Sequence, residues 1–233
     1  MSQQLPLPLQ GDGDEAGPAL PARLGFPLAT DGGSPFDDDE RFFEPWWPGA
    51  QAFLRRAGAH LELRTEHLSD PLAAFPELRA VAERLSADGV IVEGTLLALD
   101  LEGRPDSRLL RRRLTGAGSA DEVTEGAFVA SDLLYLEGRP LGRQPFVERR
   151  RQLASVLPDS DHYVLGRGLV GEGVTLGLAV ASLGLSAISA RRLDGRWRPG
   201  PAGDDWLRLR VTETPAVPTR PFLVLLEKLP LGD

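Results

Sequence analysis

The sequence predicts an α+β fold in which strands outnumber helices. Two nearly continuous apolar runs, residues 90–101 and 128–136, are typical of buried strands, and a Glu-Gly-Arg-Pro turn follows each of them. Apolar residues at helical spacing indicate three helices, in residues 76–85, 144–157 and 174–183. No repeat of strand and helix with a glycine-rich phosphate loop occurs, which argues against a doubly wound parallel sheet.

The other predicted elements follow from turn and stop signals. Residues 52–65 suggest two strands that reverse at Ala57-Gly58, and residues 185–192 and 206–211 suggest two more. The helix in 144–157 is expected to stop at Pro158, and the one in 174–183 at Gly184.

Composition limits the function classes. The chain has 233 residues and no cysteine, and its histidines His60, His67 and His162 lack metal-ligand spacing, so we expect no metal site from these residue types. No secretory signal is evident, and the weakly polar run 176–188 is too short for a bilayer, which needs about 20 residues. We therefore expect a cytoplasmic protein without a membrane partner.

The net charge of −8 is uneven along the chain. Residues 1–44 carry nine acids against Arg23 and Arg41, whereas the remainder is nearly neutral. Residues 1–33 are rich in Pro, Gly and Asp and are predicted to be a flexible acidic leader, which would repel DNA. Arginines of the body are the candidates for a DNA contact. The run Arg111 to Arg113 is better explained as a solvated loop.

Five segments of the chain form an ordered set: FFEPWWPGAQAFL (42–54), VEGTLLALDLEGRPD (92–106), SDLLYLEG (131–138), LGLSAISARR (183–192) and DWLRLR (205–210). Together they resemble the motifs of the ATP-dependent DNA ligase family, most of all of its bacterial end-joining type. Family members read roughly FEVKWDGYRAL, LDGEIVALDADGRPD, FDLLYLDG, LGLEGIVAKR and DWLKVK. The resemblance implies a nucleotidyltransferase (adenylation) domain, ATP-grasp-like, of antiparallel sheets flanked by helices. It covers about residues 35 to 211.

The resemblance also places the family's functional positions, and most hold other residue types here. Trp46 stands at the nucleophilic lysine, Pro48 at its neighbouring aspartate and Gln51 at the following arginine. The remaining positions belong to the degenerate nucleotide site. Glu66, with His67 and Leu68, stands where the family has Arg-Asn-Gly, and Thr95 and Ser186 stand in place of glutamates. Ser131 replaces the aromatic residue that stacks on adenine, and lysines are replaced by Arg191, Arg208 and Arg210.

These replacements argue against self-adenylation. A lysine amine can lose its proton and attack phosphorus, whereas an indole or a guanidinium cannot. Magnesium requires hard oxygen ligands, and both glutamate positions hold hydroxyls. The chain's only lysine is Lys228, outside the matched region; the other 25 basic residues are arginine. We expect no catalytic residue and no cofactor, with ATP and magnesium needed only if the family activity survives.

Several side chains have simpler structural explanations. Trp46 and Trp47 are expected to pack into the body or to plug the vacated cleft. Asp132 is interpreted as a strand carboxylate bonded to neighbouring amides. Glu93 and Glu102 are taken as surface groups, and His67 as solvated.

The predicted organisation is a leader (1–33), a ligase-like domain (34–212) and a short tail (213–233) in place of the family's OB-fold domain, since only 22 residues follow Val211. The leading hypothesis is an inactive pseudo-ligase that serves as a DNA-repair binding or scaffolding protein, with DNA or a protein as partner. A working ligase that seals nicks through an enzyme-AMP intermediate, and a decayed structural remnant, are the alternatives.

Overall fold

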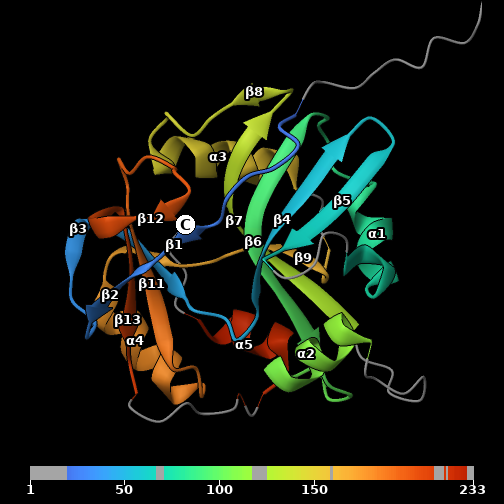
Figure 1. The fold of residues 1–233 in the computed structure, drawn as a ribbon. Helices are drawn as coiled ribbons and strands as arrows, with labels where there is room; N and C mark the ends of the chain where they lie inside the picture. The colour runs from blue at the N-terminus through green and yellow to red at the C-terminus, as the bar shows by residue number, and fades with distance from the viewer. Residues whose placement is uncertain are drawn as a thin grey trace, which may run out of the picture.

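The computed structural model describes residues 20–66, 71–116, 125–157, 160–212, 218 and 220–229. It has the predicted α+β class, with two curved sheets packed against one another and short helices on their outer sides (Figure 1). Both sheets are mainly antiparallel, as the resemblance implied.

The larger sheet has six strands, ordered β5-β4-β6-β7-β8 with β9 also paired to β7. The turn at Gly58, whose φ is 58°, joins two strands as predicted, and both predicted apolar runs are strands. The bounds are β4 Ala50–Ala57, β5 His60–Thr65, β6 Val90–Leu99, β7 Glu125–Leu136, β8 Arg139–Pro140 and β9 Tyr163–Leu165.

The second sheet has five strands in the order β10-β3-β11-β13-β2. The predicted strands in 185–192 and 206–211 are confirmed as β11 and β13, which pair antiparallel. The bounds are β2 Thr30–Gly33, β3 Asp38–Pro45, β10 Leu169–Gly171, β11 Ala187–Arg192 and β13 Trp206–Arg210; a separate parallel pair is β1 Pro27–Leu28 with β12 Gly200–Pro201.

Three helices confirm the periodicity predictions: α1 Pro76–Ala82, α3 Phe146–Val156 and α4 Gly173–Ser182. The prediction that Arg111 to Arg113 form a loop is wrong, because they lie in helix α2, Ser107–Thr115. Asp106 caps this helix by accepting hydrogen bonds from the amides of Arg108 and Leu109, at 2.7 and 3.4 Å. Short 3₁₀ turns lie at Pro71–Ala73 and Gly203–Asp205.

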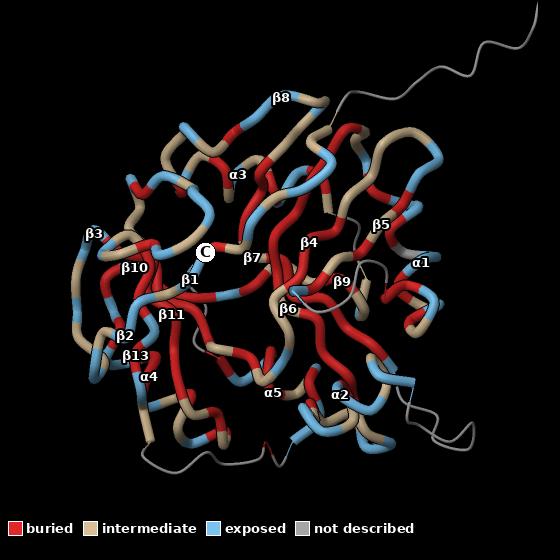
Figure 2. The backbone as a smooth tube through the Cα atoms, in the orientation of Figure 1, coloured by how far each residue is buried: buried red, intermediate tan, exposed pale blue. Residues whose placement is uncertain are grey.

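The apolar core has two main clusters. One lies between the larger sheet and helices α1 to α3, and includes Leu54, Phe75, Phe128 and Leu153. The other contains residues of β3, β11 and β13 together with Leu176 and Val180 of α4, and it extends to residues of β6 and β7. Figure 2 shows the central strands buried along most of their length, so these strands are covered on both faces.

Two predicted segment boundaries differ from the structure. Strands begin at Pro27, inside the predicted leader, because β1 and β2 form parallel main-chain pairs with β12 and β13. Residues 1–19 lie outside the described residues. In the predicted tail, helix α5 (Phe222–Lys228) packs into the core through Phe222, Leu225 and Leu226. Within the described ranges, no helix has the length and apolar content that crossing a bilayer requires.

Candidate functional site

A small cavity lies where the turn between β3 and β4 meets residues of β6, β7 and β11 and the first residue of β13. It encloses about 70 Å³, which is less than the roughly 300–1,000 Å³ of ordinary small-molecule pockets. Its lining mixes aromatic, hydroxyl and charged side chains: Glu44, Pro45, Trp46, Trp47, Gly49, Gln51, Glu93, Gly94, Thr95, Ser131, Ser189, Arg191 and Trp206.

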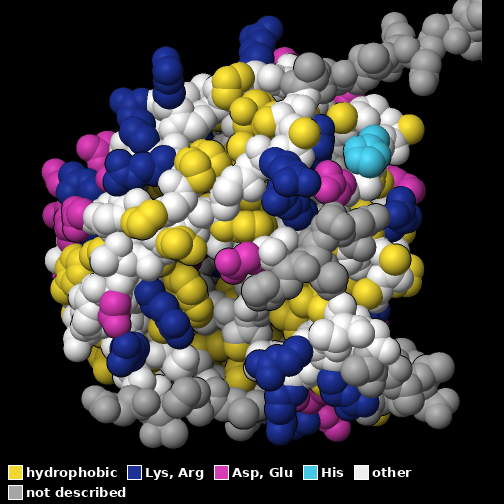
Figure 3. Space-filling view, viewed as in Figure 1, with side chains coloured by type: hydrophobic (Ala, Val, Ile, Leu, Met, Phe, Trp, Pro, Cys, Tyr) yellow, Lys and Arg dark blue, Asp and Glu magenta, His cyan; other side chains and the backbone are white. Residues whose placement is uncertain are grey.

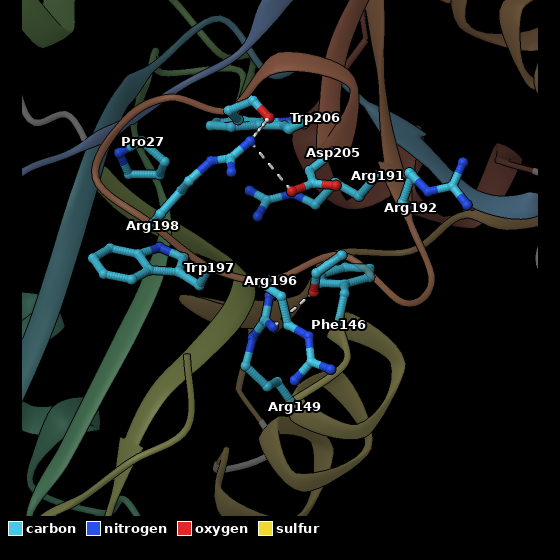
Figure 4. Close-up of a pocket in the computed structure, with 12 residues that line it drawn as sticks. Pro27, Phe146, Arg149, Arg191, Arg192, Arg196, Trp197, Arg198, Asp205 and Trp206 are labelled. Carbon is cyan, nitrogen blue, oxygen red and sulfur yellow. Dashed lines mark hydrogen bonds and ion pairs between the residues drawn. The ribbon is translucent and has the colours of Figure 1, made fainter. Parts of the chain in front are cut away.

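Arg191, on β11, occupies the centre of the charged part of this lining. Its side chain is 8% exposed and lies 3.0 Å from Glu93, 3.5 Å from Asp132 and 3.7 Å from Glu44. The guanidinium carbon also lies 4.1 Å from the ring centroid of Trp206 and 5.5 Å from that of Phe146, so both rings cover the cation. Figure 4 shows Arg191 with Trp206 and Phe146 nearby.

Glu93 is buried, and the prediction that it is a surface group is wrong. It is 1% exposed, and it accepts hydrogen bonds from Gln51 at 3.1 Å, Arg191 at 3.0 Å and Trp197 at 2.8 Å. Three donors offset the cost of burying its charge. Glu102 is exposed as predicted and pairs with Arg104 at 2.6 Å.

Asp132 on β7 is held mainly by Arg149 of α3. The guanidinium donates two hydrogen bonds, of 2.8 Å and 2.7 Å, to the two carboxylate oxygens. The amide of Leu133 donates a third, of 2.8 Å, which confirms part of the predicted bonding to neighbouring amides. The two-pronged contact fixes α3 against the sheet.

Glu44 is the third carboxylate of the group, and it is the least well bonded. Burial, the largest influence, raises the pKa of Glu44, although Arg150 and Arg191 act in the opposite direction. Burial also disfavours the charged form of Arg150, which lies 3.8 Å from Glu44, and so lowers the pKa of Arg150. For Arg191, burial disfavours the charge, but the three carboxylates outweigh it and raise the pKa. The cluster thus contains three guanidinium groups and three carboxylates.

The two tryptophans of the β3–β4 turn have different positions. Trp47 is 5% exposed and packs edge-on against Phe222 of α5, with ring centroids 5.2 Å apart, so its predicted packing into the body is confirmed. Trp46 is half-buried, lines the cavity and stacks on Trp206 with centroids 5.7 Å apart. The guanidinium of Arg208 lies 4.9 Å from the Trp46 ring.

The structure brings together only part of the site predicted from sequence. The cavity is lined by five of the predicted positions: Trp46, Gln51, Thr95, Ser131 and Arg191. Arg208 contacts Trp46 from outside the cavity. Pro48, Glu66 and Ser186 are not among its lining residues, and Arg210 pairs instead with Asp31 at 2.7 Å. His67 and Leu68 lie outside the described residues.

Sequence reasoning missed four residues in and around the site, Glu44, Ser189, Arg149 and Arg150, and it misassigned Glu93 to the surface. The one available signal was a charged residue inside an apolar strand, as with Glu93. Among the described residues, no group of three or more His, Asp or Glu side chains is placed to hold a metal ion.

Comparison with known proteins gives consistent relatives. The chain is 29% identical over 182 residues to the DNA ligase of Thermococcus fumicolans, which covers 74% of this chain and 33% of that protein. It is 29% identical over 166 residues to the multifunctional non-homologous end joining DNA repair protein LigD of Mycobacterium tuberculosis, covering 71% of this chain and 21% of that protein. No family model matches the chain.

A solved structure of mycobacterial DNA ligase D, complexed with ATP and MES, superposes with a TM-score of 0.67 at 28% identity. The match covers 80% of this chain and 60% of that one. The chain spans a third or less of the length of the two curated relatives above. Fold, motif order and relatives agree: the chain is homologous to ATP-dependent DNA ligases, and it has the fold of their adenylation domain.

Proposed function

We propose that this chain is a non-catalytic member of the ATP-dependent DNA ligase family. In this proposal the chain does not take up AMP covalently, and it binds DNA in a repair setting. The supporting observation is the identity of position 46. Trp46 lines the cavity, and the sequence resemblance aligns it with the family's nucleophilic lysine; an indole has no basic nitrogen that can attack phosphorus. Lys228, the chain's only lysine, is exposed on α5 and does not line the cavity.

The side chains around the cavity fit a magnesium–ATP complex poorly. Glu93 and Asp132, two of the nearby carboxylates, are already bonded to guanidinium groups, so their oxygens are not free to bind a cation. Thr95 and Ser131 present hydroxyls. The enclosed space of about 70 Å³ is small for a nucleotide. In this proposal the internal ion pairs take over the positions where bound nucleotide and metal would otherwise contribute charge.

The first test is incubation with radiolabelled ATP and magnesium, followed by a denaturing gel. An active ATP-dependent ligase serves as the positive control. We expect no labelled band at 25.2 kDa. A labelled band would overturn the proposal and favour a working ligase with an unrecognised nucleophile.

The second test addresses the binding half of the proposal. The relatives' names, DNA ligase and end joining DNA repair protein, support DNA as the partner. Titration of a nicked duplex at several salt concentrations should show affinity that falls steeply as salt rises, because phosphate contacts release counterions. Absence of binding even at low salt would contradict a DNA partner and favour the structural remnant.

A further inference from the structure

Three exposed arginines without internal partners lie on two segments that are hydrogen-bonded to one another at Gly142 and Trp197. Arg139 lies on β8, Arg143 follows it in the loop before α3, and Arg196 lies in the loop before β12. Within the part of the chain that the structure describes, none of the three forms a hydrogen bond or ion pair through its side chain. We call these residues the arginine surface. Figure 3 shows dark-blue side chains gathered along the upper left edge, over the region of β8, α3 and β12.

The backbone under the arginine surface is held by specific bonds. The amide of Trp197 donates to the carbonyl of Gly142 at 2.9 Å, which joins the Arg196 loop to the Arg143 loop. Arg149 donates to the carbonyl of Gly195 at 3.0 Å, and the Trp197 indole donates to buried Glu93. Because these loops are already ordered, a ligand that binds them meets a smaller entropic cost.

Most acids beside these loops are neutralised by other arginines. Asp194 pairs with Arg192 at 3.1 Å, and Asp205 lies 3.5 Å from Arg198. Figure 4 shows Arg196 and Arg198 in the loop that follows β11, and Arg192 at the end of that strand; all three line a small pocket with Trp197. The local charge is therefore positive although the chain carries −8 overall.

Helix α2 is the competing basic region, and three of its four arginines have partners; among the described residues Arg111 is exposed without one. Arg113 pairs with Glu77 at 3.0 Å and covers the ring of Phe75 at 4.1 Å. Arg108 lies 3.5 Å from Asp106, and Arg112 also has an interaction within the fold. A phosphate would have to displace these partners, whereas the arginine surface needs no such exchange.

We propose that the arginine surface binds the phosphate backbone of duplex DNA. This inference rests on the proposed DNA-binding function and adds where the contact is made. A guanidinium presents parallel N–H donors that match two phosphate oxygens, and it keeps its charge at any physiological pH. Contacts of this kind position a protein on the duplex without reading its sequence.

The test compares two variants that each lose two exposed arginines. R143Q/R196Q removes two members of the arginine surface, and R79Q/R84Q removes two arginines on and just after α1, at another part of the molecule. Fluorescence anisotropy with a nicked duplex, at salt from about 50 to about 200 mM, gives the slope of log affinity against log salt.

We expect R143Q/R196Q to lower the magnitude of that slope by about 1.8, or about 0.9 for each lost phosphate contact, and to weaken binding about tenfold at the low-salt end. R79Q/R84Q should bind as the unmodified protein does. Thermal unfolding checks that both variants are folded; should R143Q/R196Q melt early, the single variants R143Q and R196Q replace it, each with an expected slope change of about 0.9.

Four outcomes would overturn the inference. Equal binding by R143Q/R196Q and the unmodified protein would place the DNA contact elsewhere and leave the proposed function standing. Equal losses in both double variants would indicate a general charge effect. An acidic peptide or duplex RNA that displaces the DNA at lower concentration than unlabelled DNA would identify a different partner. Absence of any DNA binding by the unmodified protein would remove the inference together with the DNA half of the proposed function, but not the prediction on ATP.

Discussion

Glu93 on β6 and Arg191 on β11 form a buried ion pair, with 3.0 Å between carboxylate oxygen and guanidinium nitrogen, that joins the two sheets across the cavity. The residues are 98 positions apart in the chain, and each also bonds to further side chains of the cluster. Because this pair connects elements of both sheets, changes to the cluster are expected to alter stability as well as ligand preference.

Placing a lysine at position 46 is not expected to restore adenylation. In W46K the amine would stand beside Thr95 and the bonded Glu93, without the carboxylates needed for magnesium. We expect labelling by radioactive ATP to stay below about a thousandth of that of an active ligase, because losses in a catalytic set are not repaired one at a time. The labelling of W46K is compared with that of the double variant W46K/T95E, which also places a carboxylate at position 95. Full labelling of W46K alone would show that Trp46 was the only obstacle.

Removing the charge of Asp132 should destabilise the fold strongly. In D132N, Arg149 loses the carboxylate that accepts its two hydrogen bonds, and the cluster retains an excess of buried positive charge. We expect a loss of about 3–5 kcal/mol in the free energy of unfolding, measured in urea. D194N removes an exposed pair to Arg192 and should change it by about 0.5 kcal/mol or less. Similar values for the two variants would contradict a buried network.

Glu44 should make stability depend on pH in a defined direction. Burial raises its pKa in the folded protein above the unfolded value of 4.5, so the fold favours the protonated form. The stability that it contributes is complete below the unfolded pKa and is lost as pH rises through the folded pKa. E44Q cannot ionise, so its stability relative to the unmodified protein should increase over this window, by at most about 1.4 kcal/mol per pH unit. If the free energies of unfolding of E44Q and of the unmodified protein change equally with pH across this window, the raised pKa of Glu44 is contradicted.

Trp47 should hold helix α5 in place. W47A removes the ring that packs against Phe222 and leaves a cavity between the β3–β4 turn and α5. We expect a loss of about 3–5 kcal/mol in the free energy of unfolding. Hydrogen exchange should report faster opening of α5 than of α4, which packs on β3, β10 and β11. Unchanged protection of α5 would show that other contacts suffice to hold it.

The sequence predicts those elements whose side chains form a local pattern. The strand in 90–101 and the helix in 144–157 are examples, because continuous apolar character and helical periodicity follow directly from their burial. Strand β2, with the sequence Thr-Asp-Gly-Gly, has no such pattern; it is held by main-chain pairing to β13. Helix α5 was missed because its partner, Trp47, is distant in sequence.

For the site, the family resemblance assigned Trp46, Thr95, Ser131 and Arg191 to a degenerate nucleotide site. All four line one cavity, but the resemblance gave no sign of what surrounds them. The burial of Glu93 depends on Arg191, Gln51 and Trp197, which come from three other segments. A charge in an apolar strand is ambiguous until such partners are known, which explains why Glu93 was mistaken for a surface residue.

Strand β2 also covers one long side of β13, which would otherwise present unpaired amides and carbonyls to its surroundings. A chain shortened to begin at Ser34 would lose that cover although every residue of the ligase-like motifs would remain. Uncovered strand sides recruit strands from other molecules, so the shortened chain should self-associate and precipitate, and the polar stretch from Thr30 to Gly33 thereby helps to keep the molecules apart.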